Sequence, residues 1–164
     1  MKKIVLLLLL TITFSGCEKD DICAEETTPR LVLEFYDISN PSNLKNVLNL
    51  KVTGEGQSEL GTYNGVNKVE LPLDITNDIT KYSLILNSAS ATGANEDSLQ
   101  FNYIRQNIFV SRACGYKTIF LLNDSPDGVI KTDTATPEDF WIQDINIVTT
   151  NIETENETHI KIYF

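Results

Sequence analysis

The stretch Arg30-Leu31-Val32-Leu33-Glu34-Phe35-Tyr36-Asp37-Ile38 is the first clear β-strand of this 164-residue chain. In an extended strand, successive side chains point to opposite faces. Leu31, Leu33 and Phe35 therefore share one face, while Glu34 lies on the other. This alternation predicts a strand with one buried side.

The same two-residue period recurs along most of the chain, whereas no window shows a convincing helical period of 3.6 residues. Further strands are predicted at residues 47–53, 58–63, 69–73, 81–86, 99–104 with a continuation at 108–110, 116–122, 141–149 and 159–164. Short strands separated by turns predict an all-β fold. We expect a single antiparallel β-sandwich domain, immunoglobulin-like or related, of about seven to nine strands, with an open β-barrel as the alternative.

Several connections carry recognisable local signals. Asn64-Gly65 is typical of a two-residue hairpin turn. Asn40-Pro41-Ser42-Asn43 has turn chemistry, and Arg105-Gln106-Asn107 should break or bulge its strand. Residues 151–158 read as an exposed acidic tip between the last two strands, and residues 136–139 resemble a short helix start.

The N-terminus has the organisation of a lipoprotein signal peptide. Lys2 and Lys3 precede an apolar run at residues 4–14, and Phe14-Ser15-Gly16-Cys17 resembles a lipobox, in which the cysteine sulfur receives lipid before cleavage. We therefore expect a signal peptide at residues 1–16, a lipidated acidic tether at 17–29 and a β-sandwich domain at 30–164. The alternative is that Cys17 is an ordinary core or disulfide cysteine.

The residues that follow Cys17 suggest a second targeting signal. Glu18, Lys19, Asp20 and Asp21 resemble the export signal of surface lipoproteins in the Bacteroidota. The simpler alternative is a solvated acidic tether. The expected location is the outer membrane, lipid-anchored and surface-exposed, with the periplasmic face as the alternative.

Two cysteines remain once Cys17 is assigned to lipid. Cys23 and Cys114 form an even pair in an exported chain, which favours a disulfide bond. Two free buried thiols are the alternative. Zinc ligation is disfavoured, since the chain has one histidine and no Cys-x-x-Cys motif.

Composition narrows the possible partners. The formal net charge is −10 and the pI is about 4.5, and the basic residues beyond the signal peptide are scattered singly. Nucleic-acid binding needs clustered basic residues and is disfavoured. The expected partners are a membrane, through the N-terminal lipid, and an envelope protein or a glycan.

Few residues suggest chemistry, and we expect no cofactor and no metal. His159, the single histidine, is expected to be an exposed strand residue rather than a catalytic base. Residues 123–128 imitate the start of a calcium loop, but Thr134 stands where its closing glutamate would be, so a plain turn is favoured. Ser98 and Thr134 lie in Asp-Ser/Thr-apolar patterns and are candidate O-glycosylation sites.

Four segments together carry a resemblance to a known group. They are Cys17-Glu18-Lys19-Asp20-Asp21-Ile22-Cys23, Thr28-Pro29-Arg30-Leu31, Ala113-Cys114-Gly115-Tyr116-Lys117 and His159-Ile160-Lys161-Ile162-Tyr163-Phe164. The chain resembles small flavobacterial lipoproteins described only as a domain of unknown function. That resemblance implies a Bacteroidota envelope protein but brings no activity.

The function expected is therefore a non-enzymatic binding or scaffolding module anchored to the cell envelope by lipid. One alternative is a carbohydrate-binding accessory lipoprotein that uses the aromatic residues Tyr36, Tyr63, Tyr103 and Trp141, although most of these are expected in the core. The other is an envelope hydrolase that uses clustered carboxylates.

Overall fold

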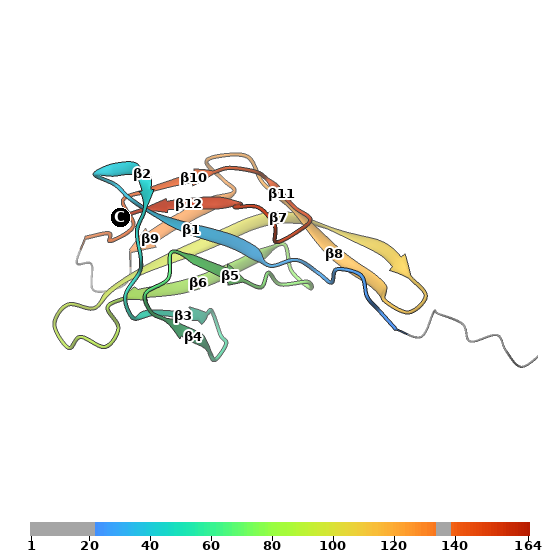
Figure 1. Cartoon of the computed structure of the whole chain (residues 1–164), viewed down its shortest axis with the longest axis horizontal. Coiled ribbons are helices and arrows are strands. Elements are labelled where there is room, and N and C mark those ends of the chain that lie inside the picture. Colours follow the sequence, from blue (N-terminus) through green and yellow to red (C-terminus); the bar gives the residue numbers. More distant parts are fainter. Residues whose placement is uncertain (1–21, 134–138) are drawn as a thin grey trace, which may run out of the picture.

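The first predicted strand is a central strand of the smaller of two sheets. The computed structural model describes residues 22–133 and 139–164. Its smaller sheet has the order β10-β12-β1-β2, with β5 also beside β1 (Figure 1). The strands are β1 (Leu31–Asp37), β2 (Asn40–Leu44), β5 (Lys68–Leu71), β10 (Asp144–Ile147) and β12 (Ile160–Tyr163).

The larger sheet has the order β11-β8-β7-β6-β3-β4, with β9 also beside β7. Its strands are β3 (Leu50–Gly54), β4 (Glu59–Tyr63), β6 (Ile79–Leu86), β7 (Asn95–Ser111), β8 (Gly115–Leu122), β9 (Val129–Asp133) and β11 (Asn151–Ile152). The two sheets pack with their apolar faces together, which is a β-sandwich.

The inner faces of both sheets supply one apolar core. Leu31, Leu33 and Phe35 are fully buried, as their alternation predicts. Trp141 fills the layer between the sheets: its ring centroid lies 6.4 Å from that of Phe35, and its Nε1 donates a 3.0 Å hydrogen bond to the Leu84 carbonyl. Burying each large apolar side chain contributes roughly 1.5–3 kcal/mol, so this core is the main source of stability.

Strand β7 is much longer than the sheet that contains it. Its first part pairs with β6 on one side, through Asn102, and with β9 on the other. From Tyr103 onward β7 pairs only with β8. The two strands therefore leave the body as a two-stranded ribbon, residues 106–119, which we call the arm (Figure 1).

The predicted β-sandwich is confirmed, and the sheets do not close into a barrel. Two details of the prediction were wrong. The described residues contain twelve strands rather than seven to nine, because short pairings such as β2 and β11 leave no alternation in the sequence. The sandwich is also not purely antiparallel, because β12 runs parallel to β1, with Leu33 opposite Ile160.

The Asn64-Gly65 hairpin prediction was wrong. Strand β4 lies in the larger sheet and β5 in the smaller one, so the chain crosses between the sheets at this point. Gly65 has a φ of 69°, and Val47 and Val66 form an isolated bridge beside it. The left-handed conformation that favours glycine serves an inter-sheet corner here.

Other local predictions also failed. Arg105-Gln106-Asn107 neither breaks nor bulges β7; the register shift lies between Phe109 and Ser111. Asn40-Pro41-Ser42-Asn43 belongs to β2, and Leu48, within the strand predicted at residues 47–53, lies outside β3 and is 54% exposed. Residues 151–158 are not simply an exposed tip, since Ile152 is fully buried.

Most of the predicted helix start, at residues 136–139, lies outside the described residues. The described part of the chain contains strands and turns but no helix. It accordingly holds no helix long and apolar enough to cross a membrane.

Candidate functional site

The segment before β1 lies along the outer edge of β8. Strand β11 covers this edge at Phe120 and Leu121. Nearer the arm tip, the Thr118 amide donates to Thr28 Oγ1 at 3.0 Å. An uncovered strand edge invites pairing with other chains, so this segment protects β8 as well as leading out of the domain.

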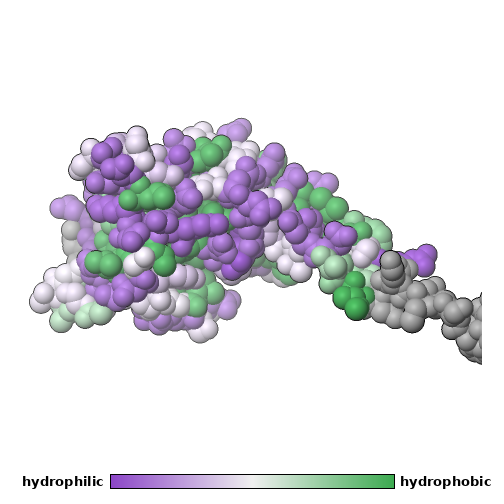
Figure 2. Space-filling view, viewed as in Figure 1, coloured by the Kyte–Doolittle hydropathy of each residue, from purple (hydrophilic) through white to green (hydrophobic). Residues whose placement is uncertain are grey.

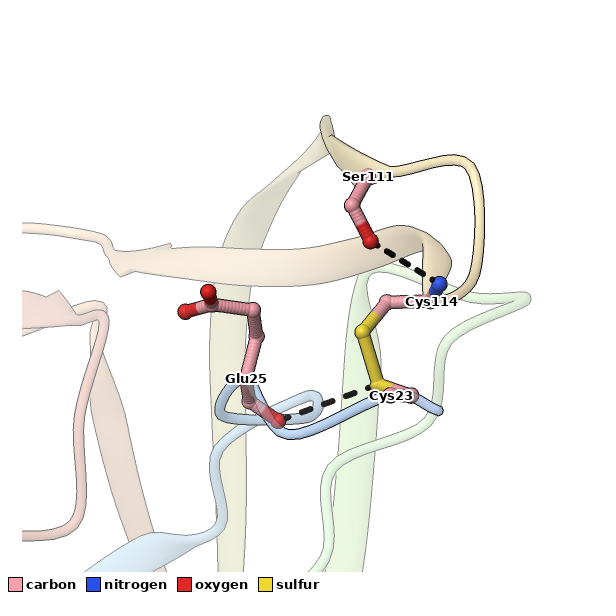
Figure 3. Close-up of a disulfide and its surroundings, with 4 residues drawn as sticks. All are labelled: Cys23, Glu25, Ser111 and Cys114. Atoms are coloured by element: carbon pink, nitrogen blue, oxygen red, sulfur yellow. Dashed lines mark hydrogen bonds between the residues drawn. A yellow bond between two sulfur atoms is a disulfide. The ribbon is translucent and has the colours of Figure 1, made fainter. Parts of the chain in front are cut away.

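The predicted disulfide between Cys23 and Cys114 fastens this segment to the arm tip. The two Cα atoms lie 4.8 Å apart although 91 positions separate the residues in sequence. Cys114 belongs to the turn between β7 and β8, where its amide donates to Ser111 Oγ at 3.1 Å (Figure 3). The Cys23 sulfur lies 4.0 Å from the Glu25 carbonyl oxygen.

An ion pair fastens the other end of the same segment. Arg30 donates two hydrogen bonds, of 2.8 and 2.6 Å, to the Glu155 carboxylate, and its Nη2 also lies 2.5 Å from Glu70. The hydrogen bond from Arg30 lowers the pKa of Glu155 and raises the pKa of Arg30. The segment is therefore held at both ends, by the disulfide at the arm tip and by this pair beside β1.

The arm carries apolar side chains that no second layer covers. Phe109 and Tyr116 face each other across β7 and β8, with ring centroids 5.4 Å apart and rings nearly perpendicular. They continue the inner face of the larger sheet beyond the end of the smaller sheet. Phe109 is 56% exposed and Tyr116 is 72% exposed. Ile22, next to the disulfide, is 81% exposed.

The prediction for His159 was wrong, because this residue is fully buried. Its Nδ1 accepts a 2.9 Å hydrogen bond from the Val32 amide, which ties the start of β12 to β1. Burial lowers its pKa, against the nearby charge of Glu157 and the backbone of Thr154. His159 is a neutral structural residue in the folded domain.

The two candidate glycosylation sites differ in what the structure describes. Ser98 lies within β7, between Ser83 of β6 and Thr132 of β9, and is half-buried. The preceding Asp97 is fully buried, and its Oδ2 accepts a 2.7 Å hydrogen bond from the Ile142 amide. Thr134 lies outside the described residues.

Two shallow grooves adjoin the larger sheet, the first of them on its outer face. One, of ≈ 560 Å³, is lined by Lys51, Lys81, Ser83, Glu96 and Ser98 among others. Ser83 Oγ donates to Glu96 at 2.5 Å, and Lys81 lies 3.3 Å from Glu55. Its acidic side chains thus already have partners.

The second groove, of ≈ 820 Å³, contains Asp74 and Asp78. Hydrogen bonds from Thr76 and Asn77 lower the pKa of Asp74 to about 2. Arg105 donates to Asp78 at 2.7 Å. These acids organise a turn, and residues 22–133 and 139–164 contain no group of three or more His, Cys, Asp or Glu suited to holding a metal.

The turn predicted at residues 123–128 is confirmed. The amides of Asp127 and Gly128 both donate to the Asp124 carbonyl. A side chain on Gly128 would place its Cβ 2.1 Å from the Asn123 carbonyl oxygen. Close packing of the backbone therefore explains why a glycine occupies position 128.

The predicted aromatic residues do not form one platform. Tyr103 and Trp141 are in the core, at 2% and 7% exposure. Tyr36 is half-buried on the outer face of the smaller sheet, where its ring centroid lies 5.6 Å from that of Tyr163. Lys161 Nζ lies 4.8 Å from the Tyr36 ring centroid.

Sequence reasoning missed the exposed aromatic pair at the arm tip. The sequence offers little signal for this pair, because Arg105 and Asn107 interrupt the apolar face of Leu99, Phe101 and Tyr103 before Phe109. Cys17, Glu18, Lys19, Asp20 and Asp21 lie outside the described residues.

These features define a disulfide-bonded, all-β sandwich protein with a projecting two-stranded arm. A family model described as a family of unknown function, DUF6452, matches residues 49–164, and the chain belongs to that family. The match begins one residue before β3, so it includes Cys114 but not Cys23. No curated protein and no solved structure matches the chain.

Proposed function

We propose that this chain is a cell-envelope protein that is anchored by lipid on Cys17 and that its β-sandwich acts as a non-enzymatic binding or scaffolding module. The observation that carries the proposal is the Cys23–Cys114 bond, only six residues after Cys17. Structural disulfides persist in oxidising compartments, which is where the signal-like N-terminus would deliver the chain.

The surroundings of the disulfide support an anchoring role. The bond joins the segment behind Cys17 to the arm tip, and the Arg30–Glu155 pair fixes the same segment to the body. Force on the lipid would therefore be transmitted to the folded domain through these two attachments. Two or more acyl chains hold a protein durably, since each buried methylene contributes ~0.8 kcal/mol.

The substitution Cys17→Ala tests the anchor. The variant should move from the membrane fraction to the soluble fraction, and the mass of the mature wild-type protein should exceed that of residues 17–164 by the lipid. The double variant Cys23→Ser/Cys114→Ser is the matched control, because it loses the disulfide but keeps Cys17, and it should remain with the membrane. Retention of Cys17→Ala in the membrane fraction would refute the anchor.

We place the protein on the outer surface of the outer membrane, because Glu18, Lys19, Asp20 and Asp21 resemble a surface-export signal of the Bacteroidota. Protease added to intact cells should degrade it. Replacing these four residues with Ser and Gly should protect it while leaving it membrane-bound. Protection of the wild-type protein would assign it to the periplasmic face.

A second candidate function, glycan binding, is favoured by one observation. Tyr36, Tyr163 and Lys161 form a stacked group on the outer face of the smaller sheet. Aromatic faces stack on sugars, and a flanking ammonium group can pair with an acidic one. Glycan-array binding that Tyr163→Ser abolishes and Tyr116→Ser preserves would favour this candidate, whereas no binding to any glycan would argue against it.

A further inference from the structure

We propose that the arm tip seats in the surface of the membrane that carries the lipid, so that Phe109 and Tyr116 form a second contact beside the anchor. This inference rests on the proposed lipid anchor. It goes further because it assigns a membrane-binding role to the folded domain itself and fixes which end of the molecule meets the bilayer.

The first argument is reach. A chain of six residues spans at most roughly 20 Å when fully extended, at ~3.3–3.6 Å per residue. Cys23 is six residues from Cys17 and is bonded to Cys114 at the arm tip. Whatever path the tether takes, the tip stays within that distance of the lipidated residue. The disulfide thus restricts the end of the arm to the region of the membrane surface.

The second argument is the surface that the tip presents. Phe109 and Tyr116 are exposed and packed against each other, with Ile22 exposed beside the disulfide. Figure 2 shows hydrophobic residues on the arm next to the start of the grey trace, while the body face in view is mostly hydrophilic. Aromatic and aliphatic side chains of this kind favour the headgroup boundary, where an apolar ring is buried and a hydroxyl stays wet.

The third argument is charge. In a chain with a formal charge of −10, residues 98–123 contain no Asp or Glu, and they include Arg105, Arg112 and Lys117. Arg105 is engaged by Asp78, whereas Arg112 is exposed at the tip. The acidic groups near the tip belong to the tether: Glu25 and Glu26 lie beside the disulfide, and Glu18, Asp20 and Asp21 lie in sequence between Cys17 and Cys23. The arm is thus the part of the domain that an anionic membrane repels least, and the aromatic pair supplies most of the contact.

Fluorescence of the full-length lipidated protein tests this arrangement. The protein is reconstituted into vesicles of equal parts phosphatidylcholine and phosphatidylglycerol, with bromine on the acyl chains as quencher. Tyr116→Trp places a reporter at the tip, and Ile130→Trp, 41% exposed in the wild type on β9 of the body, is the matched control. Buried Trp141 gives the same background in both proteins.

The tip reporter should lose about half of its emission, because interfacial side chains sit ~5–10 Å into the headgroup region. The body reporter should keep its emission. Adding Phe109→Ser to the Tyr116→Trp protein should reduce the quenching. If both reporters lose the same fraction of their emission in vesicle-bound protein, the inference is overturned while the anchor proposal stands.

The Cys17→Ala form of the tip reporter separates this inference from the anchor proposal. Loss of both vesicle binding and quenching supports a tip contact that depends on the anchor. Vesicle binding with persistent quenching would show that the tip binds without lipid, which refutes the anchor proposal but supports the tip contact. Vesicle binding without quenching would refute both.

Discussion

Gly128 shows how one residue decides the path of the chain between β8 and β9. The two strands pair one after the other with the same edge of β7, and the turn at residues 123–128 connects them. At Gly128 the backbone approaches Asn123 so closely that a Cβ would lie 2.1 Å from the carbonyl oxygen. A side chain here has to displace backbone.

We predict that Gly128→Ala destabilises the domain by more than about 2 kcal/mol, because relief of this overlap requires a backbone shift. Gly61→Ala is the matched control: nothing lies within 4 Å of its added Cβ, and its φ is ordinary. That variant should stay within about 0.5 kcal/mol of the wild type. Urea unfolding measures both, and equal losses would contradict the role assigned to Gly128.

His159 makes stability depend on pH in a direction that can be worked out. Its folded pKa lies below the ordinary value of 6.5, because burial disfavours the charged ring. Below pH 6.5 the unfolded chain binds a proton that the folded chain does not. The stability that the neutral His159 contributes is therefore fully present above pH 6.5. It is lost as the pH falls toward the folded pKa, with a limiting slope of ~1.4 kcal/mol per pH unit.

We predict that His159→Asn weakens this dependence. The amide oxygen can accept the Val32 hydrogen bond in place of Nδ1, but it does not titrate. Between about pH 7 and pH 5, the free energy of unfolding of the variant should fall less than that of the wild type. Other titrating groups are common to both proteins, so parallel curves would contradict the assignment.

These residues also show what sequence could not reveal. His159 has the alternation of a strand residue and was predicted to be exposed, because nothing local indicates that its ring meets the Val32 amide of β1. Asp97-Ser98-Leu99 has the form of a modification site, yet Asp97 points into the core. Both outcomes depend on segments distant in sequence, which local patterns do not encode.

At the scale of elements, the disulfide at the end of the arm should stabilise the arm and the tether more than the packed sheets. A disulfide that closes a loop of this length contributes roughly 4–5 kcal/mol at most in the chain-entropy model. The Cys23–Cys114 bond, however, lies at the end of the arm, away from the core cluster. Opening it should free the tether and the arm tip before it affects the packed sheets.

We predict that Cys23→Ser/Cys114→Ser accelerates amide hydrogen exchange in residues 22–29 and 105–118 and leaves β1 and β12 close to wild type. Mass-spectrometric hydrogen exchange resolves these peptides. Reductant should reproduce the effect in the wild type and have no further effect on the double variant. Equal acceleration in β1 and β12 would show that the bond stabilises the whole domain instead.

The predictability of the elements follows from how local their signals are. Strands with one buried face, such as β1 and β6, were predicted from alternation alone. The Asn64-Gly65 pair has the local chemistry of a hairpin, but its flanking strands find partners in different sheets, which no local signal specifies. The disulfide was predictable because only two cysteines remained after Cys17.

At the scale of the whole molecule, the last strand completes the smaller sheet. β12 lies between β1 and β10, and its Ile160 and Ile162 are fully buried. Because β12 pairs with β1, the two ends of the domain hold each other although 127 positions separate Leu33 from Ile160. Removing either β1 or β12 would therefore interrupt the smaller sheet.

We predict that a chain ending at residue 159 does not unfold cooperatively, because it lacks the central strand of the smaller sheet. Circular dichroism during thermal unfolding measures this. The matched control Ile162→Val should remain cooperative and lose only about 0.5–1.5 kcal/mol. A cooperative transition in the truncated chain would contradict the assigned place of β12.

The parallel pairing of β1 with β12 has a consequence for how an exported chain matures. If the chain is exported as proposed, Cys17 and Cys23 reach the far side of the membrane long before residues 160–164, because export proceeds from the N-terminus. The smaller sheet cannot assemble until that last segment has crossed. Under the proposed lipid anchor, lipid attachment would precede folding, and the domain would fold beside the membrane, with β12 as the last strand to cross.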